Sequence, residues 1–212
     1  MIQTNPQHTA KTHYDSALPD YRTLYRSDKT FQKECNSFKN LCATVRAVGR
    51  KPETLMNGPL HHLVFDARNE AGSVGRESLS SLAGRGKVRK DLWNGDVRPF
   101  VESLLAFAAK GGDLTEKEFA DREAAFSAAV GGSATAVFRR LVAAAFPAET
   151  VAVYSDADLD RLLRALSAEV PAGATWLARC AAAHAAIHAE WPWPDTTVRS
   201  VLARRLAAEA GT

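Results

Sequence analysis

The sequence predicts a mostly α-helical protein, an irregular multi-helix bundle with a glycine-rich basic loop and little or no sheet. Alanine, the strongest helix former, rises from 7 in residues 1–98 to 31 in residues 99–212. Apolar side chains recur at helical spacing in several segments. Alternating polar and apolar stretches are scarce, and VAVY at 151–154 is too short to support a sheet alone.

The first expected helix follows Ser27 and stops near Gly49 and Pro52. Residues 71–87 read as a loop, because several glycines interrupt any helical pattern there. The apolar side chains of the helix follow its period: Phe31, Cys35, Phe38, Cys42 and Val45.

Six further helices are expected in the second half of the chain. Thr115 and Glu118 form a capping-box pattern ahead of an apolar run, and Ser155 with Asp158 repeats it. The expected ranges are 98–110, 115–130, 134–146, 156–168, 174–190 and 195–210.

Two of these helices carry clear apolar stripes. The first holds Leu159, Leu162, Leu163 and Leu166. The second holds Val198, Val201, Leu202 and Leu206, and its pattern leaves Arg199, Arg204 and Arg205 outside the stripe.

The domain organisation expected from these patterns is a polar N-terminal arm over 1–26 and a single helical domain over 27–212. A sub-boundary near 98–112 stays open. No apolar run reaches the roughly 18 to 20 residues that cross a bilayer, and the start of the chain lacks an apolar signal core. Three cysteines without a CxxC pair fit a reducing compartment. We therefore expect a cytoplasmic protein with no membrane partner.

Charge is distributed unevenly along the chain. Residues 1–98 carry 16 Lys and Arg against 10 Asp and Glu, a balance of +6, whereas residues 99–212 carry 11 against 14, a balance of −3. A basic first half favours an anionic partner. The alternative is an ordinary solvated surface.

The stretch RGKVRK at 85–90 is the densest basic cluster. Flexible, glycine-rich basic segments suit phosphate contacts, and a nearby aromatic ring can stack on an exposed base. The alternative is a solvated charge run with the tryptophan packed inside. The expected nucleic-acid-binding residues are Arg76, Arg85, Lys87, Arg89, Lys90, Trp93 and Arg98.

The same stretch does not form a nucleotide-binding P-loop. That motif, GxxxxGK[ST], needs a first glycine where this chain has Ser81 and a hydroxyl residue where it has Val88. No lysine follows an acidic residue by two positions, as metal-dependent nucleases commonly need, and GxSxG and HExxH are absent. We expect no catalytic residues and no cofactor.

The segment RCAAAHAAIH at 179–188 offers two weaker motifs. Cys180, His184 and His188 lie at i, i+4 and i+8, a spacing that can gather metal ligands on one helix face. The first two also belong to an apolar stripe, and a second ligand-rich segment is missing, so we expect packing and no metal. Arg179 and His184 match the RxxxxH spacing of the all-α HEPN ribonucleases, a short motif that also arises by chance.

Two runs resemble the N-terminal region of McrB-like restriction ATPases, the motor subunits of modification-dependent restriction systems. They are FKNLCATVRAVGRKPETLMNGPLHHLVFDARNEAGSVGRESLS, followed by DLWNGDVRP, and VFRRLVAAAFPAETVAVYSDADLDRLLRAL. The resemblance spans roughly 35–168. It implies an N-terminal module that recognises DNA, an AAA+ motor domain and a separate nuclease subunit. This chain has no Walker A sequence, so it corresponds to the recognition part alone or to a stand-alone relative.

The expected function is a non-catalytic DNA-recognition module of a McrB-like restriction or antiviral defence system, with modified DNA as one candidate target. The alternative from another class is a helical protein-interaction or assembly domain of a defence complex. A HEPN-like ribonuclease ranks below both.

Overall fold

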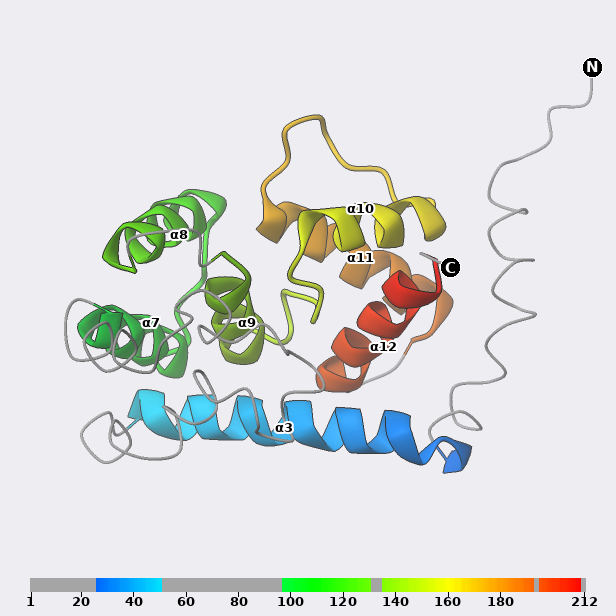
Figure 1. Ribbon diagram of the computed structural model, residues 1–212, viewed down its shortest axis with the longest axis horizontal. Coiled ribbons are helices and arrows are strands. Elements are labelled where there is room, and N and C mark those ends of the chain that lie inside the picture. Colours follow the sequence, from blue (N-terminus) through cyan, green and yellow to red (C-terminus); the bar gives the residue numbers. More distant parts are fainter. Residues whose placement is uncertain (1–25, 51–96, 131–134, 193–194, 211–212) are drawn as a thin grey trace, which may run out of the picture.

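The computed structural model describes residues 26–50, 97–130, 135–192 and 195–210 (Figure 1). Seven helices hold 76% of the described residues, and no strand occurs among them, so the mostly α-helical prediction is confirmed. The helices are α3 (Lys29–Arg50), α7 (Arg98–Ala109), α8 (Glu116–Ala129), α9 (Thr135–Ala145), α10 (Asp156–Ala165), α11 (Trp176–Glu190) and α12 (Thr196–Glu209).

Helix α3 lies along one edge of the molecule, with the other described helices on one side of it (Figure 1). Its N-terminus is capped by Asp28, whose Oδ1 accepts hydrogen bonds from the backbone N–H groups of Thr30 at 2.9 Å and Phe31 at 3.0 Å. The predicted apolar stripe is buried, and the helix packs on α7, α9 and α12. One face of α3 therefore belongs to the core, and the opposite face is turned outward.

Two ion pairs join α3 to α12. Asp28 pairs with Arg205 at 2.5 Å, and Lys39 pairs with Asp195 at 2.6 Å. Since the position advances along α3 while it falls along α12, the two helices run in opposite directions. Asp195 also caps α12 and accepts a hydrogen bond from the Thr197 N–H group.

Two helices end in the same backbone motif, in which the two residues after the cap donate back to the last turn. At the end of α7, Gly111 has φ +73° and supplies the left-handed residue that this turn requires. At the end of α10, Ser167 takes that position with φ 51°. Helix α10 therefore ends at Ala165, before the predicted end at residue 168, because its chain reverses at Ser167.

The predicted N-terminal caps are present. Thr115 and Glu118 form a reciprocal capping box at α8. Ser155 accepts a hydrogen bond from the Asp158 N–H group at α10, but the Asp158 side chain pairs with Arg161 instead of returning the bond. The box predicted at α10 is therefore half formed.

The VAVY segment at 151–154 is buried coil. Several of its backbone groups are bonded by helices, and no strand among the described residues pairs with it. The Ala152 N–H group donates to the Ser200 carbonyl at 3.3 Å, and the Val153 carbonyl accepts from Trp176 Nε1 at 3.0 Å. Because α11 and α12 meet these polar groups, an extended buried segment needs no sheet here.

The buried side chains form one apolar cluster to which every described helix contributes. In the described part of the chain, no helix combines the length and the apolar character needed to span a lipid bilayer. The predicted N-terminal arm, residues 1–26, lies outside the described residues except for Arg26. At the possible sub-boundary near 98–112, helix α7 contributes Val101, Leu104 and Leu105 to the shared core.

Gly49 marks the closest approach of α3 to α7. A Cβ atom at this position would lie 2.2 Å from the Leu105 carbonyl oxygen and 2.8 Å from the Ala109 Cβ atom. The predicted stop near Gly49 and Pro52 agrees with the end of α3 at Arg50, and the missing side chain at Gly49 also allows the close packing on α7.

Gly49→Ala is expected to lower the free energy of unfolding by about 2 kcal/mol, because overpacking against a backbone group outweighs the helix propensity gained. Urea denaturation measures the change. Ala47→Gly, at an exposed position of the same helix, is the control and should lose about 1 kcal/mol through propensity alone. A stabilised Gly49→Ala protein would show that α3 and α7 do not approach this closely.

Candidate functional site

Of the seven predicted nucleic-acid-binding residues, Arg98 lies in the described part of the chain. It is the first residue of α7, and its Nε atom pairs with Glu102 Oε1 at 3.1 Å. The Glu102 carboxylate therefore offsets part of its charge. The remaining six residues lie outside the described residues: Arg76, Arg85, Lys87, Arg89, Lys90 and Trp93.

The outward side of α3 forms a basic surface that the sequence reading did not single out. Helical spacing places Lys29, Lys33, Asn36 and Asn40 in one row, with small residues at positions 43 and 47 extending it. All of these side chains are exposed. We call this surface the α3 cationic face and define it by Lys29, Lys33, Asn36, Asn40, Arg46 and Arg50.

Acidic groups near the α3 cationic face are few. Residues 26–50 carry six Lys and Arg and two Asp and Glu, a balance of +4. Asp28 is one of the two carboxylates. The Phe31 N–H group, followed by Arg205, holds the pKa of Asp28 below its ordinary value, so that this charge is engaged at the helix cap and by α12. The exposed lysines and arginines of α3 therefore dominate the local charge.

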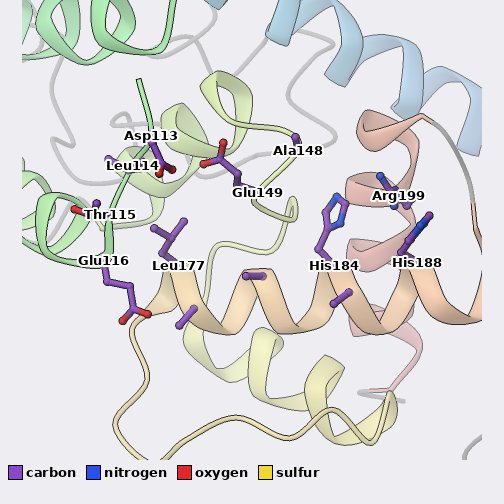
Figure 2. A pocket seen from close by; sticks show the side chains of 13 residues that line it. Asp113, Leu114, Thr115, Glu116, Ala148, Glu149, Leu177, His184, His188 and Arg199 are labelled. Carbon is purple, nitrogen blue, oxygen red and sulfur yellow. The ribbon is translucent and has the colours of Figure 1, made fainter. Parts of the chain in front are cut away.

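A second feature is a cleft of about 650 Å³ between α11, the start of α12 and two loops (Figure 2). The floor is apolar and comes from α11, including Leu177, Ala178, Ala181 and Ala185. Polar groups rise on both sides of this floor. They are Asp113, Thr115, Glu116, Glu149, His184, His188 and Arg199.

Arg199 is the residue whose position differs most from the sequence prediction. The residue is 8% exposed, so the prediction that it lies outside the apolar stripe is wrong. The physical reason is that α12 packs on three helices, α3, α10 and α11. Together these helices bury more of the α12 surface than the predicted apolar stripe covers. Arg204 and Arg205 are partly buried as well.

The cleft has acidic residues toward one end and basic residues toward the other. Burial, followed by the charges of Arg199 and His188, lowers the pKa of His184 from 6.5 to about 4. Desolvation, followed by the charge of Asp113, raises the pKa of Glu149, although part of that residue reaches solvent. Figure 2 shows the acidic side chains toward one end and His184, His188 and Arg199 toward the other.

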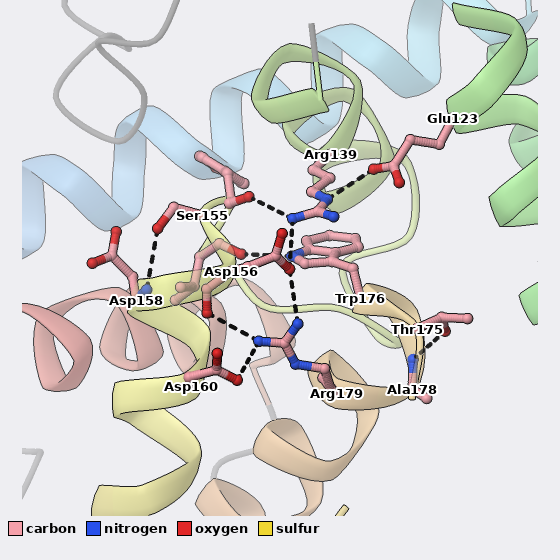
Figure 3. A network of polar contacts seen from close by, with 12 residues as sticks. Glu123, Arg139, Ser155, Asp156, Asp158, Asp160, Thr175, Trp176, Ala178 and Arg179 are labelled. Atoms are coloured by element: carbon pink, nitrogen blue, oxygen red, sulfur yellow. Dashed lines mark hydrogen bonds and ion pairs between the residues drawn. The ribbon is translucent and has the colours of Figure 1, made fainter. Parts of the chain in front are cut away.

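The two weaker motifs of α11 are separated by the fold. Arg179 reaches α10, where it contacts Asp156 and Asp160 (Figure 3), whereas His184 lines the cleft. Arg179 and His184 therefore do not share a site. Cys180 is 0% exposed, in agreement with the packing interpretation, and burial raises its pKa to about 12. Among the described residues, no three His, Cys, Asp or Glu side chains are grouped for a metal ion.

Buried Arg139 lies at the centre of a polar network that joins four helices (Figure 3). Its Nε donates to Glu123 of α8 at 2.8 Å, and its Nη1 lies 3.0 Å from Asp156 of α10. The guanidinium also lies over the Trp176 ring of α11, 5.4 Å from the centroid. Since Asp156 pairs with Arg179 as well, this network ties α9, α10 and α11 together.

Comparisons with protein-family models, with curated proteins and with solved structures return no match to this chain. The McrB-like resemblance therefore stays a prediction.

Proposed function

We propose that this chain is a non-catalytic DNA-recognition module, which grips the DNA backbone through basic surface residues. The observation that carries the proposal is the α3 cationic face. It combines exposed Lys29, Lys33, Arg46 and Arg50 with two exposed asparagines on a helix that packs on the core along its other side.

The dimensions of α3 suit a DNA groove. A helix of 22 residues is about 33 Å long, close to one turn of duplex DNA, and the major groove admits an α-helix. Lysine and arginine neutralise phosphates or contact guanine, and asparagine can pair with adenine. The small residues Ala43 and Ala47 leave room for close approach.

The basic stretch RGKVRK, which lies outside the described residues, is the second part of the proposal. Arg50, at the end of α3, is followed by the segment that carries RGKVRK. In our proposal the loop and α3 bind the same duplex. The McrB-like resemblance suggests the setting, a restriction system in which an AAA+ motor and a nuclease act on the DNA that this module binds.

The test is the salt dependence of DNA affinity. Changing Lys33, Arg46 and Arg50 together to Gln should weaken binding to every duplex and flatten the slope of log K against log salt by roughly two to three, because each lost phosphate contact removes about 0.9. The matched control changes Lys110, Lys117 and Arg164 to Gln, which removes the same charge from exposed positions on other elements. The control should leave the slope unchanged.

A second variant tests the loop. Changing Arg85, Lys87, Arg89 and Lys90 to Ala should flatten the slope by roughly two to four. If the wild type prefers cytosine-methylated over unmethylated duplex, the ratio of the two affinities should stay the same in this variant. Phosphate contacts position the protein on the DNA, whereas base contacts determine its sequence specificity. If neither variant changes the slope, the basic residues are a solvated surface, and the protein-interaction function replaces DNA recognition.

A further inference from the structure

The cleft beside α11 contains charged side chains that form no ion pair within the described part of the chain. Neither Arg199 nor the carboxylates of Asp113 and Glu149 lie within ion-pair distance of an opposite charge among the described residues. By contrast, Arg139 pairs with both Glu123 and Asp156 (Figure 3). Unpaired charges that gather in a cleft favour a binding site over a structural role.

Two buried side chains at the basic end each have one nitrogen atom without a hydrogen-bond partner among the described residues. His184 and Arg199 are each 8% exposed, and both line the cleft. The Nε2 atom of His184 and the Nε atom of Arg199 are buried, and neither has a partner in the part of the chain that the structure describes. Burial lowers the pKa of Arg199, and the charge of Asp195 offsets only part of the cost of removing the guanidinium from water. An anionic group of a ligand would supply the remaining compensation.

The carboxylates at the acidic end of the cleft favour a ligand that also carries a positive charge. Asp113 and Glu149 are exposed at the rim, and desolvation, followed by the charge of Asp113, raises the pKa of Glu149. A simple anion that approaches Arg199 would be repelled by these carboxylates. A ligand that also carries a cationic group would be attracted by them, so that both of its charged ends find opposite partners.

We propose that the cleft binds a small zwitterion of the amino-acid or short-peptide class. The ligand's carboxylate binds at Arg199 and His184, its ammonium group lies toward Glu149 and Asp113, and its body rests on the apolar floor formed by α11. The site is independent of the α3 cationic face, so this proposal and the proposed function can fail separately.

The volume and lining of the cleft agree with such a ligand. Small-molecule sites usually enclose about 300–1,000 Å³, with an apolar lining and a few convergent polar groups. The cleft has about 650 Å³, and Leu177, Ala181 and Ala185 form its apolar floor. The short alanine side chains leave space above α11 that longer side chains would fill.

Binding can be measured by amide chemical shifts of the full chain, titrated with free leucine and with the dipeptide alanyl-leucine at up to about 10 mM, a range that detects millimolar dissociation constants. The two probes distinguish an amino-acid site from a peptide site. N-acetylated probes lack the ammonium group, and C-amidated probes lack the carboxylate. We expect each modification to weaken binding of the better probe by about tenfold or more.

Two variants test which end of the ligand binds at which end of the cleft. Glu149→Gln changes an exposed residue and keeps the fold; it should weaken the unmodified probe by about tenfold and leave the N-acetylated probe unchanged. Arg199→Gln should weaken the unmodified probe and leave the C-amidated probe unchanged, and Arg199→Lys should restore part of the affinity. Arg164→Gln, exposed on α10, is the matched control and should change nothing.

The proposal is overturned if no probe produces shift changes at residues of the cleft. It is equally overturned if the N-acetylated and C-amidated probes bind as well as the unmodified ones, since the charges would then play no part in recognition.

Discussion

Replacing Phe138 with Ala is expected to lower the free energy of unfolding by about 3 to 5 kcal/mol, the range for a buried phenylalanine truncated to alanine. Phe138 of α9 is 0% exposed. Its ring centroid lies 5.5 Å from that of Phe119, 5.6 Å from that of Phe126 and 6.0 Å from that of Phe100. These partners come from α7 and α8, so the truncation removes contacts between three helices and leaves a cavity.

Urea or thermal denaturation measures this loss, and Phe107→Ala is the matched control. Phe107 is partly buried at the end of α7, and the Phe146 ring centroid lies 6.3 Å from its own. Its truncation should cost clearly less than that of Phe138. Equal costs for the two variants, or a cost below about 1 kcal/mol for Phe138→Ala, would contradict the central position of Phe138 in the core.

Acidification is expected to destabilise the protein through His184. Its pKa is lowered from 6.5 to about 4 by burial first and then by Arg199 and His188, so the folded state keeps it neutral while the unfolded state binds a proton. The associated stability is complete above about pH 6.5 and is lost as the pH falls toward about 4. Because each tenfold change in proton affinity is worth about 1.4 kcal/mol, the loss reaches at most about 3 kcal/mol.

The comparison of wild type with His184→Gln isolates this contribution, since groups that do not interact with His184 titrate equally in both proteins. Glu149 has a raised pKa, so its folded state binds a proton more readily than its unfolded state does. Its contribution to stability therefore increases as the pH falls through the ordinary pKa range of a glutamate, opposite to that of His184. Asp28 and Asp195, with lowered pKa values, lose their contributions at lower pH. Unfolding free energies measured from pH 4 to 7 should converge as the pH falls; parallel profiles would rule out a buried neutral His184.

Much of the fold could be predicted, because local rules governed it. The helical period of Phe31, Cys35 and Phe38 predicted the buried side of α3, and Thr115 with Glu118 predicted the start of α8. These signals depend on residues within one or two turns of each other. The end of α10 was less predictable, because serine seldom adopts the left-handed conformation that Ser167 has.

The candidate sites were harder to predict. Lys33 and Asn40 share the outward side of α3 because of their helical spacing, so the α3 cationic face could have been predicted from the sequence. Its basic residues are spread more widely along the chain than those of RGKVRK, and the sequence prediction therefore did not include it. Nothing local distinguishes Glu149 or Asp113 from other surface acids. They become a site because their loops meet at one end of α11.

By itself, the sequence determined the helical class of this protein, its helix starts and most of its buried stripes, since each depends on neighbours along the chain. The tertiary structure alone decided that Arg199 is buried, that Arg179 and His184 face different partners, and that opposite charges stand at the two ends of one cleft. The physical reason is that burial and electrostatic environment are set by helices that pack from distant positions. Local periodicity predicts which side of a helix is apolar, but not how many neighbours cover it.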